Sequence, residues 1–376
     1  MSGKKKRSMG MGTSATSYGY ELPDDALRLI FSKMCCTSTE LIRLRLVCKS
    51  WKRLLEGRDI RPIDRLPWIM SHRWVDHVRS VCQLYVPSEK KTYTIENVFQ
   101  VEEDRGQIID ADLLDSKHGW VMFQQTEIGK AGYPMFMYCP FTGEVIRDLP
   151  NLNELVGGAT FSSSSPTSEE CVFFAHRHVG NGIGEISICR RGDEAWKTIQ
   201  FVNEKPFTVV GGVVYSNGAF YCLFREGALG AFTVATQEWV MLFPGSAESS
   251  YLNYLIESDD ARLLMVQPAA YASAEFTNIK PFRFDFRRRI WVQEPAGCMD
   301  RRVVFLGGRL NPFAVPAEGE ASAFAGALID LGHDQVIYSN NTRDFLSTVD
   351  AYSNAKIKNR NLGRLVWIQP PNSVAS

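Results

Sequence analysis

The chain has 376 residues, 45% of them hydrophobic and 22% charged, a composition typical of a globular protein. Its 42 Lys and Arg balance its 42 Asp and Glu, which argues against nucleic acid as a partner. No apolar run approaches the roughly 18 residues of a membrane span, and no signal peptide opens the chain. The nine cysteines are odd in number and form no C-x-x-C pair. We therefore expect reduced thiols in a protein of the cytoplasm or nucleus, away from membranes.

Charge is unevenly distributed along the chain. Residues 1–61 hold 13 basic and 6 acidic side chains, whereas the remainder holds 29 basic and 36 acidic ones. Residues 1–18 are rich in Gly, Ser and Lys and lack apolar periodicity, so we expect a disordered basic tail there. The "KKKR" run within it is either a nuclear import signal or simply a solvated segment. The basic front of the chain suggests an acidic partner.

Residues 19–58 are expected to be helical, because Pro23 followed by Asp24 and Asp25 is typical of a helix start. Two sets of apolar residues then recur at helical spacing: Ala26, Leu27, Ile30, Phe31 and Met34, and Leu41, Leu44, Cys48, Trp51 and Leu55. Ile42 and Leu46 point away from the face of the second set. A segment of about 40 residues cannot enclose so many large side chains alone. Part of this surface must contact either the rest of this chain or a separate protein.

Residues 59–78 contain two prolines and are expected to be a connector, and residues 79–372 are expected to form an all-β domain. The clearest unit of that domain is a set of four predicted strands, at Val209–Tyr215, Ala219–Phe224, Ala231–Ala235 and Glu238–Phe243. The "SNG" between the first two predicts a tight hairpin, because Asn and Gly tolerate the positive φ angles of such turns.

The four-strand unit repeats along the chain. Trp196, Trp239 and Trp291 each open the last strand of a unit and lie 43 and 52 residues apart. A period of roughly 40 to 50 residues with four strands each predicts a β-propeller, here of about six blades. Strands near Val81–Val86 and Tyr93–Val98 would complete one blade together with the C-terminus. A pair of β-sandwiches is the alternative.

Two stretches carry a resemblance to a known family. "LPDDALRLIFSKM" and "LIRLRLVCKSWKRLL" resemble an F-box. The remainder is similar to the C-terminal region of a large family of plant F-box proteins with KIB-type, kelch-like propeller domains. The phrases that carry this similarity are "LPWIMSHRW", "HGWVMF" and "CPFTGEVIRDLP". Cys139 stands where such proteins often have Asn, and the kelch double-glycine pattern is absent, so "kelch-like" describes only the shape.

The resemblance implies a function without bond chemistry in this chain. In F-box proteins the two-sided helix packs on its own bundle and on a Skp-type adaptor, which docks on a cullin scaffold carrying a RING subunit. By position, the adaptor-binding residues would be Leu22, Pro23, Leu27, Ile30, Phe31, Leu41, Leu44, Val47, Cys48 and Trp51. The basic side chains of Arg45, Lys49 and Lys52 would face an acidic adaptor.

The expected function is therefore the substrate-recognition subunit of an SCF-type ubiquitin ligase, whose propeller holds an unidentified protein target. The alternative is an F-box protein that acts as a tether or regulator without ubiquitin transfer. Loops at residues 179–184, 269–278 and 311–320 are expected to form the recognition rim.

Catalytic and metal-binding motifs are weak in this sequence. His176 and His178 form an H-x-H pair on a predicted strand, but no third ligand is near them in sequence, and we expect no metal or cofactor. A propeller enzyme with an axial metal site would need acidic, amide or imidazole groups at the ends of its inner strands. The predicted blades instead begin with apolar residues and glycine.

Overall fold

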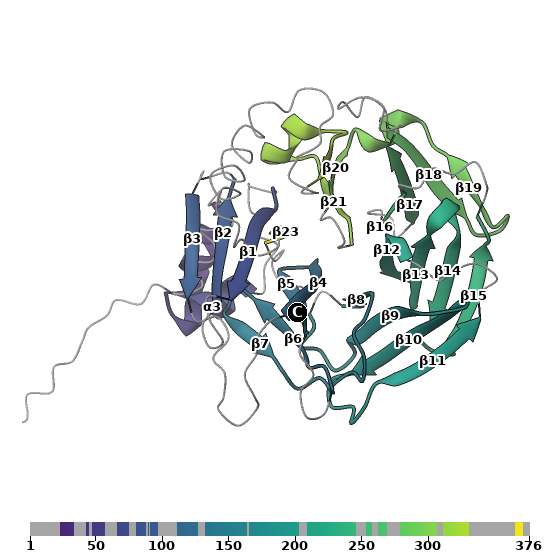
Figure 1. The fold of residues 1–376 in the computed structure, drawn as a ribbon. Coiled ribbons are helices and arrows are strands. Elements are labelled where there is room, and N and C mark those ends of the chain that lie inside the picture. The colour runs from purple at the N-terminus through teal and green to yellow at the C-terminus, as the bar shows by residue number, and fades with distance from the viewer. Residues whose placement is uncertain are drawn as a thin grey trace, which may run out of the picture.

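The computed structural model describes residues 23–33, 43–44, 47–56, 66–74, 80–87, 89, 91–96, 111–126, 132–163, 165–202, 209–245, 253–257, 262–268, 279–306, 311–330 and 365–370. Two helices, α1 (Asp24–Lys33) and α3 (Lys49–Glu56), lie near the start of the chain. Six small sheets follow and stand around a ring as the blades of a β-propeller (Figure 1). The expectation of about six blades is confirmed, and the β-sandwich alternative is wrong.

In blades 2 to 5 the strands follow the chain from the centre of the ring outward (Figure 1). Blade 2 contains β4 (Ala111–Lys117), β5 (Trp120–Gln125), β6 (Met135–Cys139) and β7 (Glu144–Ile146). Blade 3 contains β8 (Gly158–Phe161), β9 (Val172–Gly180), β10 (Ile183–Arg190) and β11 (Lys197–Val202). Blade 4 contains β12 (Val209–Ser216), β13 (Ala219–Phe224), β14 (Leu229–Thr233) and β15 (Glu238–Phe243). Blade 5 contains β16 (Tyr254–Glu257), β17 (Leu263–Pro268), β18 (Ile279–Asp285) and β19 (Ile290–Gln293).

Blades 1 and 6 depart from this order. Blade 6 has three described strands in the order β21-β20-β22, with β22 parallel to β20. Blade 1 has the order β23-β1-β2-β3, so its innermost strand comes from the C-terminal end of the chain. The bounds are β20 (Arg302–Leu306), β21 (Phe313–Pro316), β22 (Leu328–Asp330), β23 (Leu365–Ile368), β1 (Trp68–Trp74), β2 (Ser80–Val86) and β3 (Lys91–Glu96). Short 3-10 helices are η2 (Arg225–Gly227), η3 (Ala296–Met299) and η4 (Gly319–Phe324).

The ring is closed by pairing between the two ends of the propeller sequence. β1 pairs antiparallel with β23, from Trp68 opposite Ile368 to Ser71 opposite Leu365. This confirms that the early strands complete a blade with the C-terminus. β1 lies inside residues 59–78, which we expected to be a connector, so the blade begins at Trp68 rather than at residue 79. Pro67 does not prevent this, because a proline is tolerated at the start of a strand.

Blade 4 shows how far the local sequence determined the strands. Asn217 and Gly218 have φ angles of 49° and 79° and join β12 to β13, which confirms the predicted hairpin. The third strand, β14, begins at Leu229 and not at Ala231. Gly230 misled the prediction because it reads as a turn residue. It lies inside the strand, where a Cβ atom would collide with the ring of Trp239.

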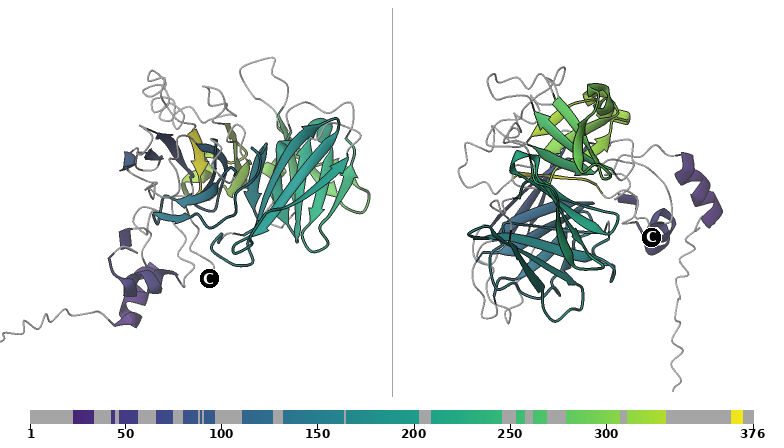
Figure 2. Two further views of the ribbon diagram at one scale, coloured as in Figure 1. Left: turned by 60° about the horizontal axis from the view of Figure 1, so that its bottom comes forward. Right: turned by 90° about the vertical axis from the view of Figure 1, so that its right-hand side faces the viewer.

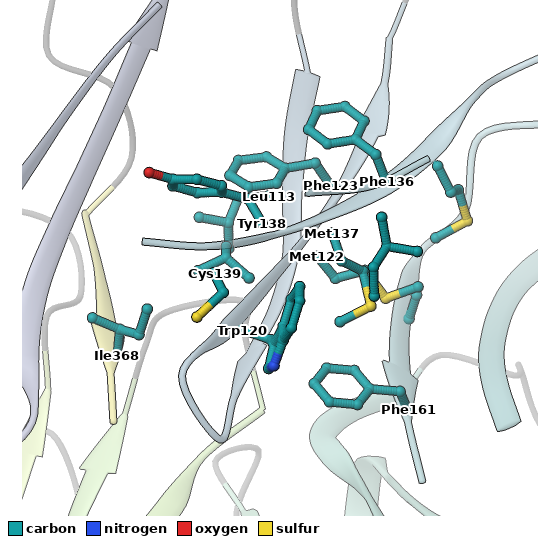
Figure 3. Close-up of a cluster of buried hydrophobic side chains, with 14 of the residues drawn as sticks. Leu113, Trp120, Met122, Phe123, Phe136, Met137, Tyr138, Cys139, Phe161 and Ile368 are labelled. Atoms are coloured by element: carbon teal, nitrogen blue, oxygen red, sulfur yellow. The ribbon is translucent and has the colours of Figure 1, made fainter. Parts of the chain in front are cut away.

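The apolar core lies between neighbouring blades. Separate clusters of buried side chains join blades 3 and 4, blades 4 and 5, and blades 5 and 6, and another joins blade 6 to blade 1. The largest cluster spans blades 1 to 3 and includes Trp120, Phe123 and Phe136 of blade 2, Phe161 of β8 and Ile368 of β23 (Figure 3). Contacts that continue round the whole ring bury the apolar residues of each blade against its neighbours.

Candidate functional site

The two described helices enclose a small apolar core of their own. Leu27 of α1 is buried against Leu54 and Leu55 of α3, and Leu44 and Trp51 pack partly buried against this cluster. The Asp24 carboxylate of α1 lies 3.9 Å from the Arg53 guanidinium of α3 on the surface. An exposed ion pair of this kind contributes little, so the leucine cluster holds the helices together.

Helix α1 begins where the sequence predicted. The N–H of Leu27 donates to the carbonyl of Pro23 at 3.0 Å, and Asp24 and Asp25 occupy the first turn. The carboxylates face the positive end of the helix dipole, which favours a helix start at this point. The helix therefore presents Leu27 and Ile30 in fixed positions relative to each other.

The described residues that we expected at an adaptor interface fall into two groups. Leu27, Leu44 and Trp51 contribute to the small core. Ile30 and Val47 are 44% and 59% exposed and belong to the exposed large apolar side chains of the described residues. Pro23 and Cys48 are also exposed. Leu22, Leu41 and the side chain of Phe31 lie outside the described residues.

A polar contact between described residues joins this helical segment to the propeller. Arg43 Nη2 donates to the hydroxyl of Tyr93 on β3 at 3.2 Å, and this hydroxyl donates to Glu89 Oε2 at 2.6 Å. The hydrogen bond to Glu89 is the main reason why the pKa of Tyr93 is raised. The helices accordingly lie at one end of the propeller beside blade 1 (Figure 2). Sequence reasoning missed this contact, because the residues are 50 positions apart and form no motif.

Two of the three expected rim loops are shorter than predicted. Within residues 179–184, β9 ends at Gly180 and β10 begins at Ile183, so only Asn181 and Gly182 form the turn. Residues 311–320 contain the strand β21 and are therefore not a loop. Residues 269–278 lie outside the described residues. The sequence suggested loops at 179–184 and 311–320 because turn-forming residues occur there, Gly and Asn in the first stretch and Asn, Pro and Gly in the second.

The two histidines of the H-x-H pair lie in different surroundings. His176 is buried, and burial lowers its pKa from 6.5 to about 4. A Cβ atom at Gly158 would lie 2.6 Å from His176 Nε2, so the imidazole fills the space beside β8. His178 is exposed. Within the described part of the chain, no group of three His, Cys, Asp or Glu side chains could hold a metal ion.

Polar groups at the inner strands are more numerous than we expected. Asp115 of β4 and Thr160 of β8 are buried near the centre of the ring, and Glu257 ends β16. The prediction that inner strands begin with apolar residues and glycine overlooked these positions, because Asp115 lies within β4 and Glu257 at the end of β16 rather than at a strand start. No described helix is long and apolar enough to span a membrane.

Comparisons with known proteins match both parts of the chain. The family model described as the KIB1-4 beta-propeller matches residues 84–345, and the F-box domain model matches residues 20–62. The chain is 29% identical over 206 residues to F-box/kelch-repeat protein At1g57790 of Arabidopsis thaliana, covering 54% of this chain and 53% of that protein. It is 27% identical to F-box protein At3g56470 and to F-box/kelch-repeat protein At3g18720 of the same plant, covering 60% and 64% of this chain.

This chain spans 53%, 56% and 59% of the length of these three relatives. Among solved structures, it is similar to the computationally designed Ika8 protein at 12% identity, with 60% of each chain covered and a TM-score of 0.32.

Proposed function

Because the chain belongs to the KIB1-4 β-propeller family and also carries an F-box domain, we propose that it is the substrate-recognition subunit of an SCF-type ubiquitin ligase. The F-box, placed at residues 19–58, binds a Skp-type adaptor and through it a cullin and a RING subunit. The propeller binds the protein target. The chain itself performs no bond chemistry, because its contribution is to hold the target near the conjugating enzyme.

One observation carries the adaptor half of this proposal. The helices close a small core with Leu27, Leu54 and Leu55, yet Ile30 and Val47 remain exposed beside it. Side chains of this kind, surrounded by polar and basic groups, are the usual anchors of a protein–protein interface. Leu22, Phe31 and Leu41 complete the proposed surface, with Pro23, Cys48 and Trp51 at its margin and Leu27 and Leu44 supporting it from behind. Lys49 is exposed and, with Arg45 and Lys52, would face an acidic adaptor.

The propeller half rests on architecture. Six blades packed against their neighbours through shared apolar clusters form a rigid body that holds its exposed turns in fixed positions. The contact of Arg43 with Tyr93 places the helical segment at one end of this body. A target bound to the propeller would therefore be held at a defined distance from the adaptor.

Two experiments test the proposal. The full chain is first co-purified with a plant Skp-type adaptor, as wild type and as the Ile30→Asp/Val47→Asp variant, with Val202→Asp on β11 as a matched exposed control. We expect the double variant to lose the adaptor and the control to retain it. Equal recovery of the adaptor by all three proteins would refute the proposed interface.

The second experiment identifies the target and its fate. Proximity labelling with and without residues 19–58, under proteasome inhibition, should enrich the adaptor and the target together. The half-life of an enriched protein should lengthen when this chain is removed. A labelled partner whose half-life does not change would instead support a tether that acts without ubiquitin transfer.

A further inference from the structure

Asn311 connects two blades that are not neighbours in the ring. It lies two residues before β21 of blade 6, and its Oδ1 atom accepts a hydrogen bond from the Val213 N–H of β12 at 2.7 Å. β12 is the innermost strand of blade 4, and blade 5 lies between the two blades in chain order. The side chain of Asn311 therefore reaches past blade 5 near the axis of the propeller.

The backbone of β12 is shaped to receive this contact. The pairing of β12 with β13 shifts register between Val209 and Gly212, so a bulge precedes the Val213 amide. Gly212 has a φ of 110°, which side chains rarely allow, and a Cβ atom there would lie 2.9 Å from Pro312 Cδ. Residues 311 and 312 thus occupy a space that exists because position 212 is glycine.

On its other side, Asn311 faces a buried carboxylate. Asp115 of β4 is 1% exposed, and burial raises its pKa, while Thr160 and Asn311 act in the opposite direction through hydrogen bonding. Neither carboxylate oxygen makes a hydrogen bond of ordinary geometry within the described part of the chain. These two contacts are therefore weaker than the bond to Val213. Because Oδ1 accepts from Val213, the Nδ2 group of Asn311 is the donor that faces Asp115.

Other charged groups lie near the same point. Lys117 at the end of β4 favours the ionised forms of both Asp115 and Glu257. Glu257 of β16 also receives a hydrogen bond from Ser216 of β12, although burial raises its pKa overall. Lys117 thus offsets part of the negative charge near the axis, so a second uncompensated carboxylate would be costly there.

We propose that Asn311 is a latch across the propeller axis, which ties blade 6 to the Val213 amide of blade 4 and to Asp115 of blade 2. The latch holds the inner ends of blades 2, 4 and 6 in one arrangement. It is a second closure of the ring, independent of the pairing of β1 with β23.

A swap of the two polar groups tests the latch in the full chain. Asn311→Asp replaces the donor with a carboxylate beside Asp115, and we expect the melting temperature to fall by roughly 5 °C or more. Asp115→Asn alone should cost little. In the Asp115→Asn/Asn311→Asp protein the amide and the carboxylate exchange places, so the donor, the acceptor and the bond from Val213 are all restored. We expect this double variant to recover most of the lost melting temperature, and Asn153→Asp on the exposed surface to change nothing.

A local measurement covers the case in which Asn311→Asp does not fold. In the Asn311→Ala protein, hydrogen exchange of the peptide that covers residues 209–216 should accelerate at least tenfold, because the Val213 N–H loses its acceptor. Exchange in β17 of blade 5 should stay the same. Unchanged exchange in residues 209–216 would overturn the latch. So would a double variant whose decrease in melting temperature equals the sum of the decreases in the two single variants.

Discussion

Truncation of the exposed apolar side chains Ile30 and Val47 should weaken adaptor binding. The loss of binding free energy should scale with the fraction of each side chain that is exposed in the free protein. Complete burial of an Ile or Val side chain is worth about 1.5–3 kcal/mol. Ile30 is 44% exposed and Val47 is 59% exposed, so only about half of that energy remains for an adaptor to gain. We therefore expect Ile30→Ala and Val47→Ala each to cost about 1 kcal/mol, or roughly a fivefold increase in Kd.

The assay is calorimetric titration of the full chain with a purified Skp-type adaptor. The Ile30→Ala/Val47→Ala protein should bind roughly 30-fold more weakly if the two sites act additively. Val202→Ala is the matched control, because Val202 is 78% exposed and lies on blade 3. Its Kd should equal that of the wild type.

The stability of each variant must be measured alongside its affinity. Substitution of an exposed side chain usually changes the free energy of unfolding by less than about 0.5 kcal/mol, so the thermal transition should not move. The reasoning fails if the double variant folds normally and binds the adaptor as tightly as the Val202→Ala control. In that case the exposed apolar pair serves another contact.

Four further outcomes are expected. Leu55→Ala empties part of the small helical core, at a cost of about 2–5 kcal/mol, and should abolish adaptor pull-down while the propeller melts normally; retained binding would contradict the core that we describe. Trp367→Ala removes a buried ring from β23 at a cost of about 3–5 kcal/mol and should lower the melting temperature of the propeller, in a differential scanning experiment, more than any exposed substitution does. The pKa of His176 is lowered to about 4, so its neutral form favours the folded state: the stability that it contributes is complete above pH 6.5 and is lost as the pH falls towards 4. A His176→Gln protein should therefore show a flatter decline of its urea midpoint between pH 7 and pH 5. Maleimide should label the exposed Cys48 in the native protein but leave Cys82 unlabelled until unfolding, because burial raises the pKa of the Cys82 thiol to about 12; mass spectrometry of the adducts decides this.

The architecture was predictable because it repeats. Trp239 and Trp291 lie in the outer strands β15 and β19, and Trp196 directly precedes β11, so the spacing of tryptophans reported the spacing of blades. Alternating strands and an Asn-Gly turn carry their signal within a few residues. Closure by β23 followed from the same argument, since a ring of sheets without closure would leave two open edges.

The errors have a common physical origin. Gly230 was interpreted as a turn residue, although it lies in a strand beneath Trp239 of the next strand. Residues 311–320 were interpreted as a loop, although β21 pairs there with β20. A glycine need not indicate a turn where close packing leaves no room for a side chain. A proline need not indicate one where it precedes or starts a strand. These conditions arise from packing, which a local pattern does not contain.

The candidate adaptor surface was predictable in kind but not in detail. An excess of apolar residues over what 40 residues can bury follows from the sequence, yet which of them stay exposed depends on how α1 meets α3. Leu27 and Ile30 are both on α1 and three positions apart, but one is buried and the other is exposed. The contact of Arg43 with Tyr93 likewise follows from the placement of the helices and not from any motif.

The polar groups near the axis bear on the choice between an enzyme and a binding protein. A catalytic carboxylate must reach a reacting molecule, whereas Asp115 is 1% exposed and lies against Thr160 and Asn311 of other blades. Asn311 in turn uses its oxygen for the Val213 amide. A side chain that already bonds another blade, beside a buried carboxylate that solvent does not reach, is suited to fixing the shape of the ring. This arrangement is consistent with our proposal that the propeller acts as a rigid body that binds a protein target.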